Sequence, residues 1–370
     1  MSEFYIGLMS GTSVDAIDAV LMDFSVSNTH IVASHSQPIG SKLRDDINAL
    51  IATRNFPKQY EKLDEQFAQA SNAAITTLLK QTSIDTSKII AIGSHGQTVF
   101  HDPKGIPAVS IQIGDPQNIA NLSNVPTVGN FRQADIDAGG QGAPLACAYH
   151  AETLQSPNQE RVVLNLGGIA NITKLPANKN ETIIGFDTGP ANTLMDAWSQ
   201  KHLNKSFDQD GNWAKSGKVN LDLLGRMLED SYFAASPPKS TGREHFNLDW
   251  IQYHLDSYGK PVSTEDVQAT LLALTMHSIA DSIDAWCPQS KEVLLCGGGS
   301  ENKFFVSQLE RALESKTIQS TRSYGIAAKW MEAMAFAWLA KQNLNNATGN
   351  IPSVTGADKP VKLGKLFNPN

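Results

Sequence analysis

The sequence predicts an α/β protein built from two related domains, and three observations support that prediction. The chain has 370 residues, a length more usual for two domains than for one. Its opening stretch, residues 5–22, consists of two β-rich runs around a small polar turn, a pattern typical of a β-hairpin. Residues 162–173 repeat the pattern of strand, glycine turn and returning strand. We therefore expect two units of one plan, each beginning with a hairpin.

Strand and helix patterns alternate through the first half. Residues 41–81 carry apolar side chains every three or four positions, which predicts helices. Residues 89–92 and 109–113 are short apolar runs that end at glycine or polar residues, as buried strands do. Residues 134–144 are rich in glycine and acidic side chains. That composition indicates a domain junction or a loop that lines a cleft.

Asp187 is the most informative residue of the second half. It lies in residues 185–192, between a β-branched run and a stretch with helical spacing, and Pro190 suits a first helical turn. Asp187 is therefore expected on a strand-to-helix turn, where free backbone N–H groups favour a phosphate. Its carboxylate either caps the helix or acts as a base beside the bound phosphate.

Three consecutive glycines, residues 297–299, follow a predicted buried strand at 292–296. A helix is expected next, from about residue 303 to residue 313. Because each glycine costs backbone entropy, the three together indicate close approach of a flat or charged ligand. Residues 270–279 and 327–340 are predicted core helices.

Composition restricts the class of protein. The formal net charge is −7, which argues against nucleic acid or an anionic membrane as the main partner. The three cysteines form no Cys-x-x-Cys pair, so neither structural zinc nor a disulfide framework is expected. The start of the chain lacks the features of a signal peptide, and no apolar run approaches the roughly 18 residues that span a bilayer. We expect a cytoplasmic protein, and the sequence leaves its oligomeric state open, a homodimer included.

Polar residues at strand ends are the candidate ligand contacts. Thr12 and Ser13, with the backbone amides of their turn, suit a phosphate, and Asp15 suits a hydrated Mg²⁺. His95 follows a predicted strand, and open α/β sheets bind ligands at strand ends. A histidine packed in the core would show the same sequence pattern. Arg132 offers a planar donor fork for carboxylate or phosphate.

Taken together, two hairpins, a strand-end aspartate and a glycine turn describe a nucleotide clamp like that of the actin, hexokinase and Hsp70 superfamily. Five segments resemble the anhydro-N-acetylmuramic acid kinase family in particular: residues 7–15, 94–98, 139–145, 164–171 and 185–190. The resemblance extends from residue 5 to about residue 356. It implies two related actin-like (ribonuclease H-like) domains with a nucleotide cleft between them. Their expected bounds are residues 1–128, completed by residues 340–370, and residues 129–339.

The resemblance also implies a reaction. Water opens the 1,6-anhydro bridge of 1,6-anhydro-N-acetylmuramic acid, and O6 accepts the γ-phosphoryl group of ATP, giving N-acetylmuramic acid 6-phosphate and ADP in peptidoglycan recycling. Asp187 would be the base that activates the water, in line with carboxylate-assisted glycoside hydrolysis. Phosphoryl transfer requires mainly positioning and charge neutralisation by Mg²⁺, and Asp15 is the residue expected to hold that ion.

The family pattern extends to binding residues. The implied ATP contacts are Gly11, Thr12, Ser13, Val14, Asp15, Ala16, Ile17, Asp18, Gly167, Gly168, Gly297, Gly298, Gly299 and Asn302. The expected sugar contacts are His95, Arg132 and Gln141. Ala16 stands where the family more often has glycine.

Two alternatives share the predicted fold: another sugar kinase of the superfamily, and a non-kinase ATPase of the actin or Hsp70 type. A dehydrogenase is disfavoured, because neither glycine turn has the Gly-x-Gly-x-x-Gly pattern with an acidic residue about 20 positions on.

Overall fold

The computed structural model describes residues 2–53 and 60–370, and the chain divides into two compact units. Unit 1 comprises residues 1–153 and 330–370, and unit 2 comprises residues 154–329. These boundaries differ from the predicted ones at 128/129 and 339/340. The predicted boundary at 128/129 lies instead at 153/154. Buried Asp135 accepts hydrogen bonds from Asn350 and Thr355 of the C-terminal segment, and these bonds hold the chain after residue 128 in unit 1. The predicted boundary at 339/340 lies instead at 329/330, because the helix that starts at Met331 packs against the strands at residues 4–9, 16–23 and 89–94 of unit 1.

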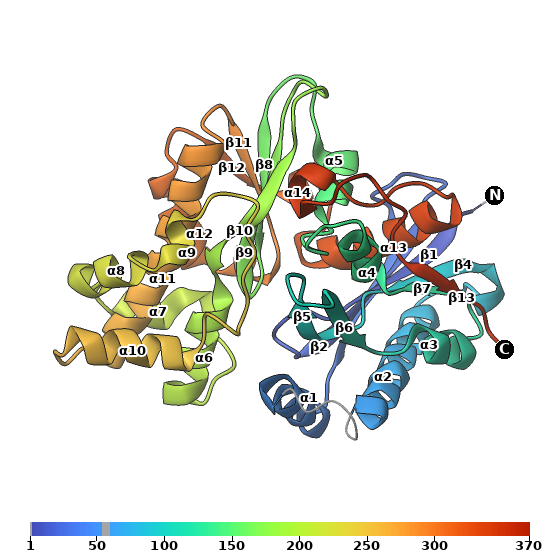
Figure 1. Cartoon of the computed structure of the whole chain (residues 1–370), viewed down its shortest axis with the longest axis horizontal. Helices are drawn as coiled ribbons and strands as arrows, with labels where there is room; N and C mark the ends of the chain where they lie inside the picture. Colours follow the sequence, from blue (N-terminus) through green and yellow to red (C-terminus); the bar gives the residue numbers. More distant parts are fainter. Residues whose placement is uncertain (1, 54–59) are drawn as a thin grey trace. The chain divides into compact units, whose positions relative to one another are not determined.

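Unit 1 contains a six-stranded mixed sheet in the order β13-β7-β4-β1-β2-β3 (Figure 1). Its strands are β1 (Phe4–Met9), β2 (Ala16–Asp23), β3 (Ile31–Pro38), β4 (Ile89–Ser94), β7 (Thr127–Gly129) and β13 (Lys365–Phe367). Strands β1, β2 and β3 form an antiparallel meander, whereas β4 runs parallel to β1 and β7 runs parallel to β4. The predicted hairpin at residues 5–22 is therefore confirmed. A separate hairpin is formed by β5 (Gln97–Asp102) and β6 (Val109–Ile113).

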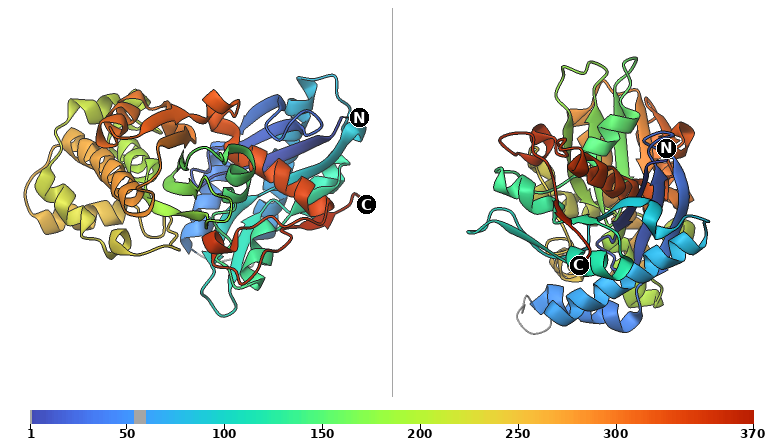
Figure 2. Two further views of the ribbon diagram at one scale, coloured as in Figure 1. Left: turned by 90° about the horizontal axis from the view of Figure 1, so that it is seen from above. Right: turned by 90° about the vertical axis from the view of Figure 1, so that its right-hand side faces the viewer.

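Helices α2 (Tyr60–Lys80) and α13 (Met331–Leu344) cover the two faces of this sheet. The other helices of unit 1 are α1 (Ser41–Thr53), α3 (Pro116–Ser123), α4 (Phe131–Asp137), α5 (Cys147–Leu154) and α14 (Pro352–Thr355). Ile6 and Leu8 of β1 belong to one apolar core with α2, and the alternate residue Gly7 faces α13. Figure 2 shows the sheet between blue α2 and red α13. The predicted helical region 41–81 is thus confirmed as α1 and α2, except for residues 54–59, which lie outside the described residues.

Glycines in two adjacent strands allow α13 to approach the sheet. A Cβ on Gly7 would collide with the carbonyl oxygen of Ala333, and one on Gly93 of β4 would collide with that of Phe336. The backbone of α13 therefore lies directly against β1 and β4. This close packing sets the position of the first turn of α13, and with it the position of Glu332.

Unit 2 repeats the plan of unit 1. Its strands are β8 (Arg161–Leu166), β9 (Ile169–Leu175), β10 (Ile184–Pro190), β11 (Glu292–Cys296) and β12 (Thr317–Ser320). The order β10-β9-β8-β11-β12 matches β3-β2-β1-β4-β7, again with an antiparallel meander followed by two parallel strands. The prediction of two related α/β units is confirmed.

The helices of unit 2 surround its core. They are α6 (Asn192–Leu203), α7 (Asn212–Ser216), α8 (Leu221–Leu228), α9 (Ser231–Ala234), α10 (Leu248–Tyr258), α11 (Thr264–Trp286) and α12 (Lys303–Ala312). Short 3₁₀ helices occur at Thr86–Lys88 in unit 1, and at Gln209–Gly211, Gly298–Glu301, Thr321–Tyr324 and Ala328–Trp330. Helix α11 buries much of its length, because its apolar residues are not confined to one narrow stripe. Throughout the described residues, none of the helices has the length and apolar character needed to cross a membrane.

Two buried histidines, His95 and His150, make unit 1 sensitive to acid. Burial lowers the pKa of His95 to about 3 and that of His150 to about 4, and the positive charge of Arg132 adds to the effect at His95. In the unfolded chain each histidine takes up a proton near its ordinary pKa of about 6.5. Because only the unfolded state binds these protons, we expect the free energy of unfolding to fall as the pH drops from about 6.5 towards 4. The limiting slope is about 1.4 kcal/mol per pH unit for each histidine.

Urea midpoints measured between pH 7.5 and pH 5.5, above most carboxylate titration, test this expectation. The variant His150→Leu should show a shallower decline, since it removes one of the two groups and leaves His95 in place. Equal midpoints for the native chain across this range would contradict the assignment.

Candidate active site

Asp187 lies inside a strand, not at a strand-to-helix turn. It pairs with Asn171 in the β9–β10 ladder, and an irregularity follows before Gly189. Strand β10 continues to Pro190, and the N-cap of α6 is Ala191, which makes no side-chain capping bond. The predicted turn and the helix-cap interpretation of Asp187 are therefore wrong. The physical reason is the meander, in which residues 184–190 bond along the edge of β9.

The backbone amides at the start of α6 are already occupied. The N–H of Asn192 donates to the carbonyl of Gly167 at 3.2 Å, and those of Ala191 and Thr193 donate to Gly168 at 2.9 and 3.0 Å. The expected set of free amides for a phosphate is therefore absent at these three residues. Instead, they hold the β8–β9 turn against the helix.

The segment around residues 230–247 holds Asp187 at three points. The Asp187 N–H donates to the carbonyl of Lys239 at 3.1 Å, and the Asp187 carbonyl accepts the hydroxyl of Tyr232 at 2.8 Å. One carboxylate oxygen, Oδ2, accepts the backbone N–H of Thr241 at 3.0 Å. Both the backbone and the side chain of Asp187 are thereby oriented, while the residue stays partly exposed.

The side chains of Lys239 and Tyr232 complete the surroundings of Asp187. Burial lowers the pKa of Lys239, and the negative charge of Asp187 opposes that effect. The Lys239 ammonium donates to the carbonyls of Tyr232 and Phe233 at 3.0 and 3.2 Å. Burial raises the pKa of Tyr232, and the charge of Asp187 raises it further, so the phenol remains a hydrogen-bond donor. Sequence reasoning left this polar segment unassigned.

A carboxylate oriented in this way is suited to general-base catalysis. Proton transfer from a reacting group requires a basic atom held in a fixed direction and accessible to the substrate. Asp187 meets both requirements, because three hydrogen bonds orient it and its side chain is partly exposed.

The turn between β1 and β2 presents the polar surface that the sequence predicted. Thr12, Ser13 and Asp15 are exposed, and the Ser13 hydroxyl donates to the Asp15 carboxylate. An added Cβ on Gly11 would meet nothing within 4 Å. These residues leave space beside the turn for a ligand.

Other residues of the same stretch have structural positions. The side chains of Val14 and Ile17 are buried in the core of unit 1, and Asp18 accepts the hydroxyl of Ser36 at 2.6 Å. Ala16 begins strand β2 opposite Pro38, so its Cβ is accommodated in ordinary extended backbone.

The glycine turn at residues 297–299 packs mainly against the protein itself. A Cβ on Gly297, whose φ is +80°, would lie 2.8 Å from the carbonyl oxygen of Leu166. A Cβ on Gly299 would lie 2.9 Å from the Asn192 amide nitrogen. Only Gly298 among the three faces open space. Close approach at Gly297 and Gly299 thus comes from residues of unit 2, and Asn302 serves as the N-cap of α12 through the Phe305 N–H.

Buried His95 and half-buried Arg132 form a hydrogen-bonded pair in unit 1. The Arg132 Nε–H donates to His95 Nε2 at 3.0 Å, and Arg132 also donates to the Gly142 carbonyl at 2.7 Å. Because arginine can only donate, Nε2 of His95 must be the acceptor, and its Nδ1–H then donates to the Gly96 carbonyl at 2.8 Å. His95 is 5% exposed and uses both ring nitrogens to orient Arg132. Gln141 lies on the same loop as Gly142, and its N–H donates to Thr355.

Glu332 joins this region from the first turn of α13, a position that sequence reasoning missed. Burial raises the pKa of Glu332, the positive charge of Arg132 opposes that effect, and the charge of Asp18 adds to it. The available signal is an acidic residue at the start of an otherwise apolar, alanine-rich helix. Only the fold brings that residue near Arg132 and Asp18.

The carboxylates of the described residues do not assemble a complete metal cage. Among residues 2–53 and 60–370, no group of three His, Cys, Asp or Glu side chains could hold a metal ion. Exposed Asp15 is compatible with Mg²⁺, because that ion usually keeps several waters and uses one or two carboxylates plus substrate phosphates.

The repeated sheet plan defines a two-unit α/β protein, and similarity to known proteins identifies its family. The family model for anhydro-N-acetylmuramic acid kinase matches residues 3–369. The anhydro-N-acetylmuramic acid kinase of Coxiella burnetii (strain Dugway 5J108-111) is 44% identical over 366 residues, covering 99% of this chain and 97% of that protein. The kinase of the same name from Shewanella frigidimarina is also 44% identical, with 99% and 98% coverage. The chain therefore belongs to the anhydro-N-acetylmuramic acid kinase family, and the predicted family and enzyme class are confirmed.

A solved structure of a ROK family glucokinase from Streptomyces griseus, in complex with glucose and AMPPNP, has a TM-score of 0.43 and 13% identity. The match covers 92% of this chain and 99% of that one.

Proposed function

We propose that this protein uses ATP and water to convert 1,6-anhydro-N-acetylmuramic acid to N-acetylmuramic acid 6-phosphate and ADP, a step in peptidoglycan recycling. Its family membership supports the substrate. The observation that carries the chemistry is the Asp187 carboxylate, oriented by the Thr241 N–H and by two backbone contacts.

Asp187 accepts a proton from water while the water oxygen bonds to the anomeric carbon of the sugar. The bond between that carbon and O6 breaks, and its electron pair stays on O6. O6 then bonds to the γ-phosphorus of ATP as the bond to the β-phosphate oxygen breaks and ADP leaves. Asp187 later releases the proton to solvent. A carboxylate that activates water is a recurring device of glycoside hydrolysis.

Nucleotide binding is assigned to the open parts of the glycine turns. The exposed hydroxyls of Thr12 and Ser13 contact the phosphates, and Asp15 contributes to holding the Mg²⁺ that neutralises their charge. Gly167, Gly168 and Gly298 contribute backbone contacts. The remaining predicted residues of the two glycine turns, Gly297, Gly299 and Asn302, act by keeping these turns in shape.

Sugar binding is assigned to the Arg132 region. The acid group of the muramic acid lactyl ether is a carboxylate, which matches the donor fork of arginine. His95 orients Arg132 from behind, and Glu332 and Gln141 offer polar groups to the sugar hydroxyls and amide.

A coupled ADP-release assay tests the proposed function. We expect ADP release that depends on 1,6-anhydro-N-acetylmuramic acid, with little release for N-acetylmuramic acid or plain hexoses. A preference for a hexose would favour another sugar kinase of the superfamily. Sugar-independent release as the sole activity would favour a non-kinase ATPase.

Removing the hydroxyls of the β1–β2 turn should weaken nucleotide binding. For Thr12→Val combined with Ser13→Ala, we expect MgATP affinity to fall by about tenfold or more, since each lost hydrogen bond to a charged group is worth about 1.5–3 kcal/mol. Sugar affinity should stay nearly constant. Calorimetric titration measures both, and Ser27→Ala combined with Thr29→Val on the β2–β3 turn is the matched control. An unchanged MgATP affinity would remove the assignment.

A further inference from the structure

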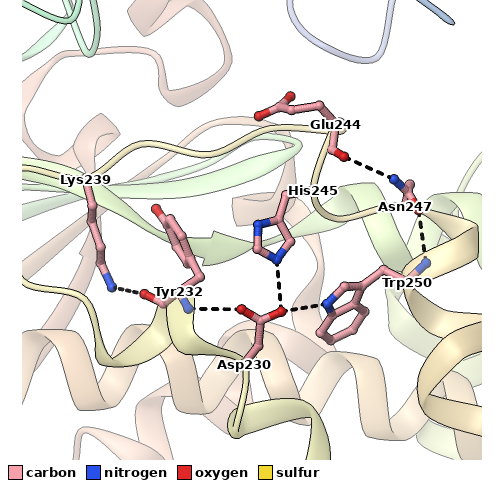
Figure 3. Close-up of polar contacts among 7 residues, drawn as sticks. All are labelled: Asp230, Tyr232, Lys239, Glu244, His245, Asn247 and Trp250. Atoms are coloured by element: carbon pink, nitrogen blue, oxygen red, sulfur yellow. Dashed lines mark hydrogen bonds and ion pairs between the residues drawn. The ribbon is translucent and has the colours of Figure 1, made fainter. Parts of the chain in front are cut away.

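The carboxylate of Asp230 accepts three hydrogen bonds from residues between α9 and the first turn of α10 (Figure 3). Oδ1 accepts the Tyr232 N–H at 2.9 Å, as the N-cap of α9. Oδ2 accepts Nε2 of His245 at 2.9 Å and Nε1 of Trp250 at 2.8 Å. The side chain of Asp230 is 14% exposed. One residue thereby links α9, the loop that follows it and α10.

Further contacts fix the segment between Lys239 and Trp250. Asn247 caps α10 by accepting the Trp250 N–H at 3.0 Å, and its amide donates to the carbonyl of Arg243 at 3.1 Å. The ring of His245 stacks on Phe246 with centroids 4.3 Å apart. Lys239 donates to the carbonyl of Tyr232, which ties the start of the loop back to α9 (Figure 3).

The same segment makes three hydrogen bonds to Asp187. The Tyr232 hydroxyl binds the Asp187 carbonyl, and the Tyr232 N–H is one of the three donors to Asp230. The Lys239 carbonyl accepts the Asp187 N–H, and the Thr241 N–H donates to the Asp187 carboxylate. Both residues lie between Tyr232 and His245, which are both bonded to Asp230. A displacement of this loop would therefore turn the Asp187 carboxylate.

We propose that Asp230 is a positioning residue for the reaction: it holds Tyr232 and the 239–245 loop in the geometry that orients Asp187. The proposal rests on the function proposed for Asp187. Asp230 acts on Asp187 through Tyr232, Lys239 and Thr241.

The hydrogen bonds that Asp230 accepts favour the ionised form of its carboxylate. Burial alone would raise the pKa of Asp230, but the hydrogen bonds from His245, Tyr232 and Trp250 outweigh burial, and the pKa is lowered. Three donors converge on two oxygens that only accept. An amide in the same place would turn an N–H₂ group towards at least one donor. Asp230→Asn therefore keeps the shape of the side chain but breaks at least one of these three hydrogen bonds.

The first measurement compares steady-state constants. For Asp230→Asn, we expect kcat to fall by about 10- to 100-fold, the scale of rate loss from a misplaced catalytic group. The KM for ATP should change little. The matched control is Asp256→Asn on the exposed face of α10, where the carboxylate accepts the Gln252 amide at 2.9 Å. That control should keep the native kcat.

A double-mutant cycle separates positioning from general destabilisation. If Asp230 acts through Asp187, then adding Asp230→Asn to Asp187→Asn should lower the residual rate less than twofold. A further loss as large as that seen in the native background would overturn the proposal. A large loss from Asp230→Asn beside near-native turnover of Asp187→Asn would instead contradict the function proposed for Asp187.

Two milder variants keep the proposal testable should Asp230→Asn fail to fold. Trp250→Phe and His245→Phe each remove one donor while keeping an aromatic ring in the cluster. Each should lower kcat by a smaller factor than Asp230→Asn, and the effect should again vanish in the Asp187→Asn background. Native kcat in both variants, with the native fold retained, would overturn the proposal.

Discussion

Replacing Asp187 by asparagine should abolish most of the sugar phosphorylation while leaving the fold and ground-state binding nearly unchanged. Asparagine keeps the shape of the side chain, and its oxygen can still accept the Thr241 N–H. It cannot accept a proton from water. Loss of a general base typically lowers the rate by about 10²- to 10⁴-fold, and a nucleophile as weak as water places the expected loss at the upper end of that range.

Rapid-quench measurement of product formation, beside calorimetric binding of sugar and nucleotide, tests this result. Asp222→Asn, an exposed change on α8, is the control and should retain full activity. Near-normal turnover of a folded Asp187→Asn protein would refute the assignment. In ¹⁸O-water, the native protein should place label at the anomeric hydroxyl of the product. Label in the phosphate would mean that water attacks phosphorus instead.

Replacing Gly7 by valine should destabilise unit 1 severely. The new Cβ would collide with the backbone carbonyl of Ala333, which cannot rotate away as the end of a flexible side chain can. Overpacking a core typically costs about 1–3 kcal/mol, and because a whole helix must move here we expect about 3 kcal/mol or more. Gly93→Val should behave in the same way, since it faces Phe336 of the same helix.

Urea unfolding measures the effect of Gly7→Val, with Gly40→Ala as the control because nothing lies within 4 Å of a Cβ at that site. Any folded fraction of Gly7→Val should also bind the sugar more weakly, since displacement of α13 moves Glu332 relative to Arg132. A native urea midpoint for Gly7→Val would show that α13 is not packed directly on β1.

Local sequence patterns predicted the repeated units because each pattern reports a local periodicity. The hairpins at residues 5–22 and 162–173 consist of short apolar runs around small turns, and both form as predicted. The helix predicted at residues 303–313 forms as α12, with Asn302 as its cap. The five family motifs carried the functional prediction, and the family match across residues 3–369 confirms it.

The sequence by itself thus determined the two-unit α/β class and the family, and it singled out Asp187 as the candidate base. Tertiary structure alone decided that Asp187 lies in a strand, because the edge bonds of β9 compete with helix-start signals at Pro190. It also decided that Glu332 lies near enough to Arg132 to feel its charge, and that Asp230 bonds to the segment that holds Asp187. These arrangements join residues that are tens to hundreds of positions apart. Local periodicity carries no information about such pairs, because they are set by how sheets and helices pack.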